Sequence, residues 1–303
     1  MTGTHRLYPA LLAVALLVAP AAVASGQGTV AGPDTTERAA ADTIFGRSGR
    51  LLARFFAPPR SMEVEPIARL FGKREQKNTS TVAVTDSASG RQLSLITLLP
   101  FADKVNGRVG DYHIGRFPAE KRAPRSAAYE NPDGFIEVTL ENKDTPVSEH
   151  FRLVDFLTHD QKNVWPKYLV LREALVDKLE LVMVELQRRG IDAQRLRVTS
   201  GFRSPQYNQK GVGRGGRARD SRHQFGDAAD IVVDNNADSR LDDLNRDGRV
   251  NSKDMRILAE AVESVERQYP ELVGGLGLYR ANSARGPFIH VDVRGQRARW
   301  GRY

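Results

Sequence analysis

Three residues in the last third of the chain constrain its fold more than any other feature. His223 and Asp230 lie close together in the sequence, whereas His290 stands near the C-terminus. Imidazole nitrogen and carboxylate oxygen are ligands that Zn²⁺ accepts, and three protein ligands with one open position are typical of a catalytic zinc site. To use all three residues on one ion, the fold must bring a C-terminal segment next to residues 223–230.

His223 and Asp230 flank a short segment of small residues. Gly226 and the two alanines before Asp230 let the backbone turn tightly. Asp230 begins the apolar run 231–233, which predicts a strand. A loop histidine and an aspartate at the start of a strand can therefore face one point and form half of a metal site.

His290 lies in a segment of alternating character, residues 288–293. Aromatic and polar side chains occupy every second position, and isoleucine or valine fills the positions between them. A period of two is typical of a half-buried strand. His290 and Asp292 therefore share one face of that strand.

Four ordered motifs surround the candidate ligands. They are Ser200-Gly201-Phe202-Arg203-Ser204-Pro205 with Asn208, residues 221–230, residues 274–279, and residues 288–294 closed by Arg299-Trp300. Together they resemble the M15 zinc peptidases, in particular the M15A-type D-Ala-D-Ala carboxypeptidases and murein endopeptidases, over roughly residues 148–303. The resemblance implies an α+β domain of the kind shared by D-Ala-D-Ala peptidases and the hedgehog fold, with zinc bound by His223, Asp230 and His290.

Arg203 lies in a turn close to the candidate site. It follows a predicted strand, 196–199, and Gly201 and Pro205 fix the turn. A guanidinium group can hold a carboxylate through two parallel hydrogen bonds. The resemblance implies that Arg203 binds substrate or polarises the scissile carbonyl, and the alternative is an arginine that braces its own loop.

The general base is left open by the sequence. Many M15 enzymes carry a glutamate three residues before the last histidine, where it accepts a proton from the attacking water, but that position is Pro287 here. Asp292 is the first candidate for the catalytic base, because a carboxylate beside a metal site can accept a proton. Its alternative role is to orient a ligand imidazole. Asp227 is a third candidate.

Residues 243–254 match the twelve-residue EF-hand calcium loop, with Gly248 at its sixth position. Apolar residues at helical spacing predict a helix after the loop, whereas residues 234–242 show no entering helix. Position 12 is Asp, as in a dockerin-type half-hand. The expected calcium ligands are Asp243, Asn245, Asp247, Arg249 through its backbone carbonyl, Asn251 and Asp254. The ion would have a structural role, and the alternative is a solvated acidic turn.

The N-terminal part predicts export. A short basic region, an apolar run and an Ala-Val-Ala ending describe a cleavable signal peptide over residues 1–24. A flexible linker with one short amphipathic helix, 51–56, is expected over residues 25–61. The chain has no cysteine, which excludes disulfides and a lipoprotein anchor. We expect a periplasmic, envelope or extracellular protein without a membrane span in the mature chain.

Two domains are predicted after the linker. Strand-like runs at 81–84, 93–99 and 135–140 predict a small β-rich domain of unknown role over residues 62–147. The peptidase-like domain over residues 148–303 should open with a helix capped by Ser148. A second, long helix is expected over residues 167–189.

Two functions are compatible with these patterns. The first is an exported zinc peptidase, of D,D-carboxypeptidase or endopeptidase type, that cuts stem peptides or cross-links of peptidoglycan. The alternative is a non-catalytic cell-wall-binding module in which zinc and calcium are structural, and Pro287 favours it. The net charge of +8 suits an anionic partner such as the cell wall. No nucleic-acid recognition motif is present, and we expect a monomer.

Overall fold

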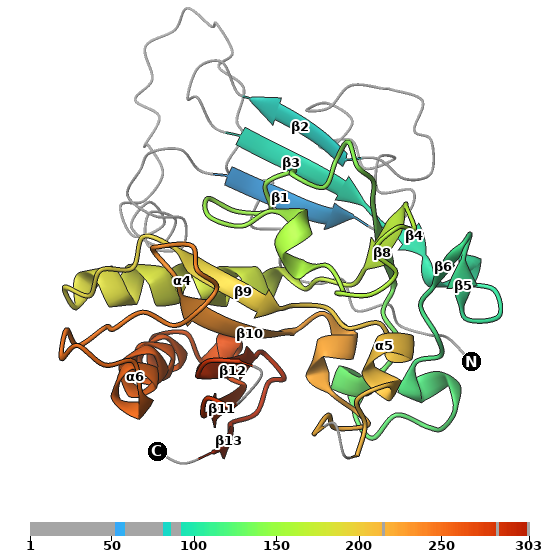
Figure 1. The fold of residues 1–303 in the computed structure, drawn as a ribbon. Coiled ribbons are helices and arrows are strands. Elements are labelled where there is room, and N and C mark those ends of the chain that lie inside the picture. The colour runs from blue at the N-terminus through green and yellow to red at the C-terminus, as the bar shows by residue number, and fades with distance from the viewer. Residues whose placement is uncertain (1–51, 58–80, 86–91, 214–215, 283–284, 302–303) are drawn as a thin grey trace, which may run out of the picture.

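The computed structural model describes residues 52–57, 81–85, 92–213, 216–282 and 285–301. The predicted signal peptide and most of the predicted linker lie outside these residues. Figure 1 shows a central sheet with two long helices beside it and smaller sheets above and to the right of it.

A five-stranded sheet forms the centre of the C-terminal part. Its strand order is β13-β11-β12-β10-β9, and all neighbouring pairs are antiparallel except β11 and β13. The strands are β9 (Leu196–Ser200), β10 (Ala228–Val233), β11 (Gly275–Tyr279), β12 (Phe288–Asp292) and β13 (Ala298–Trp300). Alternating or continuous apolar residues form these strands, as the sequence predicted for β9, β10 and β12.

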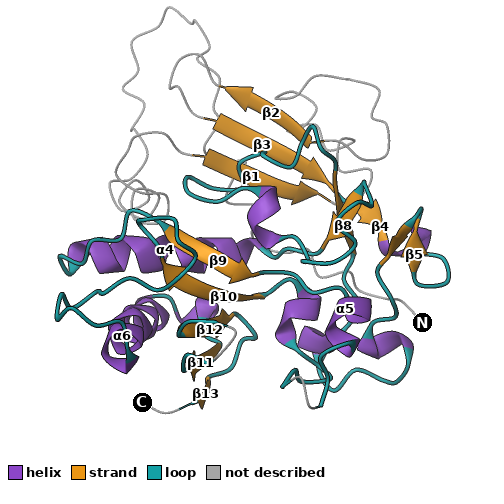
Figure 2. Ribbon diagram, in the orientation of Figure 1, coloured by secondary structure: helices purple, strands orange, loops and turns teal. Residues whose placement is uncertain are grey.

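Helices α4 (Glu173–Arg188) and α6 (Ser252–Gln268) pack against each other, and α6 contacts β11 and β12. Both helices bury apolar residues at helical spacing, such as Leu179 and Val262. These residues join the buried side chains of the sheet in one hydrophobic core. Figure 2 shows the two helices beside the central strands.

The smaller elements lie before and between these units. The strands are β1 (Leu52–Ala57), β2 (Thr81–Thr85), β3 (Gln92–Thr97), β4 (Leu99–Pro100), β5 (Arg108–Val109), β6 (Tyr112–His113), β7 (Gly134–Val138) and β8 (Lys167–Leu169). The short helices are α5 (Pro205–Gln209) and the 3-10 helices η2 (Phe101–Asp103), η3 (Pro118–Glu120), η4 (Ala127–Tyr129), η5 (Leu153–Phe156), η6 (Arg222–Phe225) and η7 (Pro270–Leu272). The strands form three small sheets, β1-β3-β2, β4-β7-β8 and β5-β6.

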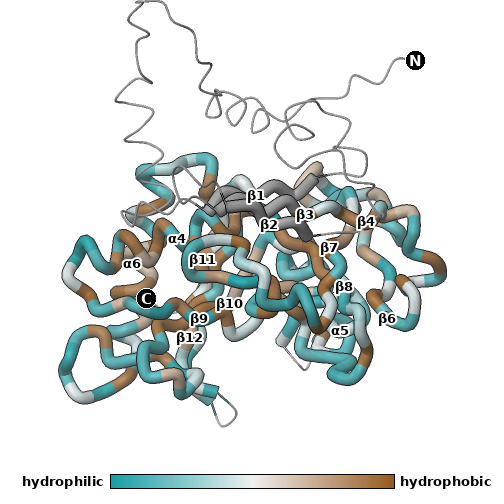
Figure 3. Tube along the Cα trace, turned by 90° about the horizontal axis from the view of Figure 1, so that it is seen from above, coloured by the Kyte–Doolittle hydropathy of each residue, from teal (hydrophilic) through white to brown (hydrophobic). Residues whose placement is uncertain are grey.

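Residues 96–147 share the hydrophobic core with the rest of the described chain. Phe117 and Phe135 from this part are fully buried and belong to the same cluster as Leu179 and Val291. Figure 3 shows hydrophobic segments along the inner elements and mostly hydrophilic outer loops. The mixture of a few helices with mainly antiparallel sheet agrees with the predicted α+β class.

Three predicted helices are wrong in part or entirely. The long helix begins at Glu173 and not at residue 167, because Lys167–Leu169 pairs with β7 as strand β8. The helix expected after Ser148 is absent, because the amides of residues 147 and 148 bond back to the Phe151 carbonyl, and only the 3-10 helix η5 follows. The helix predicted over residues 51–56 is instead strand β1, which pairs with β3.

A histidine on the loop before η5 is tied to helix α4. The His150 amide and its ring Nδ1 contact the Glu180 carboxylate at 2.9 and 2.7 Å. The hydrogen bond to Glu180 raises the pKa of His150 above 6.5. Burial raises the pKa of Glu180, but the contact with His150 outweighs burial and lowers this pKa below 4.5. Both partners are therefore mainly charged between pH 4.5 and 6.5.

This pair predicts a pH-dependent stability. A raised pKa in the folded state means that the stabilisation by His150 is present below pH 6.5 and is lost as the pH rises through the raised value. We expect the difference in unfolding free energy between wild type and His150→Gln to be larger at pH 5.5 than at pH 8.5, as measured by urea unfolding. A difference that grows with pH would contradict the assignment.

Candidate metal centre

The sheet register aligns the candidate ligands. Trp300 pairs with Gly277, Gly277 with His290, His290 with Asp230, and Asp230 with Ser200, so that these residues form one row across all five strands. Directly paired residues point to the same face of a sheet. His290 and Asp230 therefore meet although a long segment separates them in the sequence.

His223 reaches the same point from the 3-10 helix η6, which precedes β10. Gly226 ends this helix at a φ of 67°, a left-handed conformation that favours glycine. A Cβ at this position would also overlap the Val170 backbone. At Asp230 the register with β9 shifts, as in a β-bulge, and such a shift can re-aim a side chain beside a site.

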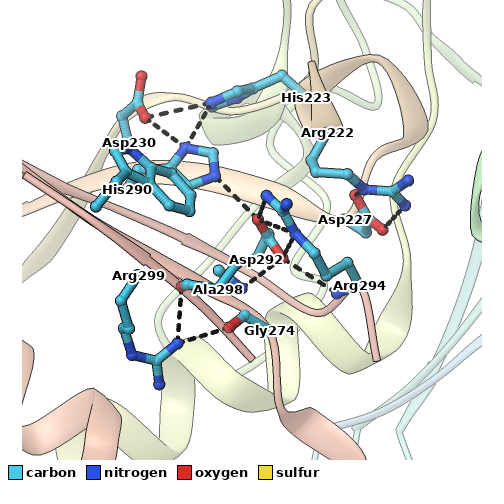
Figure 4. Close-up of polar contacts among 12 residues, drawn as sticks. Arg222, His223, Asp227, Asp230, Gly274, His290, Asp292, Arg294, Ala298 and Arg299 are labelled. Atoms are coloured by element: carbon cyan, nitrogen blue, oxygen red, sulfur yellow. Dashed lines mark hydrogen bonds and ion pairs between the residues drawn. The ribbon is translucent and has the colours of Figure 1, made fainter. Parts of the chain in front are cut away.

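Three ligand atoms lie at the spacing of a metal site (Figure 4). His223 Nε2 is 3.0 Å from His290 Nδ1 and 3.2 Å from Asp230 Oδ1, and His290 Nδ1 is 3.0 Å from Asp230 Oδ1. All three side chains are buried. A tetrahedral zinc ion with bonds of 2.0–2.1 Å separates neighbouring ligand atoms by about 3.3 Å. The three residues therefore fit one face of a zinc tetrahedron.

Each candidate ligand is held by a second partner. His223 Nδ1 is 2.7 Å from the Gly201 carbonyl and must donate its proton there, which leaves Nε2 as the metal-facing atom. His290 Nε2 is 3.2 Å from Asp292 Oδ2, which by the same reasoning leaves Nδ1 for the metal. Asp230 Oδ2 accepts from Arg203 at 2.5 Å, and its Oδ1 faces the two imidazoles.

The protonation states of His223 and Asp230 suit a cation, whereas at His290 burial is outweighed by the contacts with Asp230 and Asp292, which raise the pKa, so metal binding there must displace a proton. Burial lowers the pKa of His223 to about 4, so its ring is neutral near pH 7. Although burial opposes its ionisation, contacts with His223, His290 and Arg203 hold the pKa of Asp230 well below its usual value. A neutral imidazole and an ionised carboxylate are the forms that bind a metal.

Asp292 lies behind His290, on the Nε2 side of the ring. Its Oδ1 accepts hydrogen bonds from the Gly275 amide at 2.7 Å and the Arg294 amide at 3.1 Å, and the Arg294 guanidinium binds both carboxylate oxygens. Asp292 is fully buried, and although burial raises its pKa, the contacts with His290 and Arg294 lower it strongly overall. This geometry favours the orienting role of Asp292 over the role of proton acceptor. Asp227 is engaged in a buried ion pair with Arg222.

Arg203 is braced within the site. Its Nε donates to Ser200 Oγ at 2.9 Å and its Nη2 donates to Asp230. Burial, together with the positive charges of Arg217 and Arg285, lowers its pKa. The arginine thus pairs with the carboxylate of a candidate ligand.

Two aromatic residues, Trp300 and Tyr279, lie beside the candidate site, and the sequence had assigned no role to either. The Trp300 ring lies 5.2 Å from the His290 ring, and its Nε1 donates to the Tyr279 hydroxyl at 2.9 Å. A Cβ at Gly277 would overlap the indole. The glycine motif at residues 274–279 therefore leaves room for Trp300 beside the ligand histidine.

Residues 243–251 form a loop before α6, the helix that the sequence predicted there, and residues 252–254 belong to its first turn. The Asp243 carboxylate accepts from the Asp247 and Gly248 amides, at 3.2 and 2.6 Å. The buried Asp254 carboxylate accepts from the Leu244 and Asn251 amides, at 2.9 and 2.7 Å. Among the described residues, three carboxylate or imidazole ligands converge only at His223, Asp230 and His290, so calcium binding stays a prediction.

Comparisons with known proteins support the resemblance to M15 peptidases for part of the chain. Within the described residues, no helix has both the length and the apolar character needed to cross a bilayer. No curated protein and no solved structure matches the chain. Residues 169–254 match the family model described as Peptidase M15, and this segment contains Arg203, His223 and Asp230. The match supports the assignment of this part of the chain to the M15 peptidases, a family of zinc metallopeptidases.

Proposed function

We propose that the protein is an exported zinc peptidase that hydrolyses peptide bonds in the stem peptides or cross-links of peptidoglycan. The main support is the convergence of His223, Asp230 and His290, with their ligand atoms 3.0–3.2 Å apart and their outer atoms held by Gly201, Arg203 and Asp292. The M15 match over residues 169–254 supports the reaction class.

A zinc ion held by the three ligands would polarise the scissile carbonyl and lower the pKa of a water molecule. With His223, Asp230 and His290 as its three protein ligands, a tetrahedral zinc ion would keep a fourth position for water or substrate. Asp292 accepts from His290 Nε2, which would leave Nδ1 free to hold the ion. We therefore propose Asp292 as a positioning residue instead of the proton acceptor.

Arg203 would stabilise negative charge on the substrate. Its Nε and Nη2 are used within the site, and its Nη1 makes no hydrogen bond to another described residue. Burial lowers its pKa, and the positive charges of Arg217 and Arg285 add to this shift, so we propose a cationic rim at this point. Such a rim suits the carboxylates of peptidoglycan stem peptides.

Digestion of purified peptidoglycan tests this function. The protein is incubated with intact sacculi, with and without a zinc chelator, and the released muropeptides are separated. Conversion of cross-linked dimers to monomers indicates an endopeptidase, and release of free D-alanine with dimers intact indicates a carboxypeptidase. Unchanged muropeptides together with binding to sacculi would support the alternative, a non-catalytic wall-binding module.

We also propose that residues 243–254 bind calcium in a structural role. Asp247 is exposed and Asp243 is partly buried, and Gly248 adopts a φ of 79° at the turn between them and the helix. Calcium is expected to raise the melting temperature of the wild type but not of Asp243→Ala, because a ligand that binds only the folded state stabilises it. An equal response of both proteins to calcium would exclude the loop as the binding site.

A further inference from the structure

A buried lysine of helix α4 contacts the last residue of strand β12. The Lys178 side chain, on helix α4, is fully buried. Its ammonium group donates to Glu266 Oε1 at 2.6 Å, to the Asp292 carbonyl at 2.8 Å and to the Leu272 carbonyl at 3.0 Å. These three contacts use all of its hydrogen-bond donors.

Glu266, on helix α6, completes the connection to the sheet. Its Oε1 also accepts from the Gly274 amide at 3.1 Å, and its Oε2 binds Arg299 of β13. Arg299 in turn donates to the Gly274 carbonyl at 2.7 Å. The pair Lys178–Glu266 therefore holds two neighbouring backbone segments, one at Gly274 and the other at Asp292.

These two segments are in close contact and lead directly to the metal centre. A Cβ at Gly274 would overlap the Asp292 carbonyl oxygen. The next residue, Gly275, donates its amide to the Asp292 carboxylate, whose other oxygen faces His290 Nε2. A shift of Gly274 relative to Asp292 would therefore turn the carboxylate away from the imidazole.

Fold stability alone is a weak reason for a buried ion pair at this position. Desolvation of two charges is costly, and apolar residues of similar volume often stabilise a core equally well or better. Lys178 also occupies the position between Leu175 and Leu179, both fully buried, where an apolar residue would suit the helix. The hydrogen bonds to the Asp292 and Gly274 backbones provide a specific reason for the charges.

We propose that Lys178 and Glu266 form a positioning pair that fixes Asp292 against Gly274 and Gly275 and thereby orients His290 for metal binding. The inference rests on the proposed zinc site. The chain of contacts runs from helices α4 and α6 through the backbone of β11 and β12 to the ligand imidazole. Neither residue of the pair touches the ion or the substrate.

The test separates metal binding from stability. Zinc affinity is measured by competition with a chromophoric chelator, and the coordination geometry is read from the visible spectrum of the Co²⁺-loaded protein. The stability of the metal-free protein is measured by urea unfolding. The variants are Lys178→Met, the double variant Lys178→Met/Glu266→Leu, the milder Glu266→Gln, and Leu179→Ala as a control on the same helix.

Lys178→Met is expected to be unstable, because it removes the buried cation beside Glu266 Oε1 and the donor to the Leu272 and Asp292 carbonyls, while Arg299 still binds Oε2. The double variant should regain stability but bind zinc about 10-fold more weakly than the wild type, with an altered Co²⁺ spectrum. Glu266→Gln should show a smaller change of the same kind. Leu179→Ala should lose stability and keep the wild-type zinc affinity and spectrum.

Wild-type zinc affinity and Co²⁺ spectrum in both the double variant and Glu266→Gln would overturn the positioning role, whatever their stability. This result would leave the proposed zinc site intact, because the wild type would still bind the metal. Failure of the wild type itself to bind zinc would overturn the proposed site and the positioning role together.

Discussion

Replacement of His223 with alanine is expected to remove tight zinc binding and to lower peptide hydrolysis by about 1,000-fold or more. His223 Nε2 is one of three converging ligand atoms, and Asp230 and His290 alone would leave the ion two protein ligands. Loss of the metal removes several kcal/mol of transition-state stabilisation, and each 1.4 kcal/mol corresponds to about tenfold in rate.

The zinc content of the purified variant and its muropeptide digest provide the measurements. His113→Ala serves as the control, because His113 lies on β6 and its backbone, rather than its ring, bonds Gln161. The control should retain one zinc ion and full activity. A His223→Ala protein that keeps both stoichiometric zinc and activity would contradict the proposed centre.

Replacement of Asp292 with asparagine is expected to weaken zinc binding by about 10- to 100-fold, as for other partners that orient a ligand histidine. The charged carboxylate accepts from His290, Gly275 and Arg294 together, and the neutral amide cannot replace all of these contacts. Because the defect is in metal binding, saturating zinc should restore most of the activity.

The alternative role of Asp292 gives a different result. A general base contributes about 100- to 10,000-fold to the rate, and its loss would lower turnover while zinc affinity stays unchanged. Zinc affinity and turnover at saturating zinc are therefore measured on the same preparation. Asp234→Asn is the matched control, because Asp234 is a fully buried aspartate that follows β10 and accepts from the Ser239 amide.

The local sequence was sufficient to identify the candidate ligands and several of the elements that carry them. The alternation over residues 288–293 predicted β12 and the shared face of His290 and Asp292, which the contact between the two side chains confirms. Apolar spacing after residue 254 predicted helix α6. These features depend on a few consecutive residues, whose side chains must all face one core.

Helix boundaries were less well predicted, because pairing with distant segments overrides local preference. The pattern of residues 167–189 is helical, yet Lys167–Leu169 pairs with β7 and forms a strand. The same limit applies to Lys178, a charged residue within the apolar stripe of its helix. Its partners Glu266 and Asp292 come from elements far along the chain.

The sequence by itself determined which residues can bind a metal and the period of the strands and helices around them. Only the tertiary structure decided that Asp292 lies behind His290, that Trp300 covers the ligand ring, and that a buried ion pair holds the end of β12. The physical reason is that periodicity is set by neighbouring residues, whereas the register of the five strands depends on the burial of the whole core.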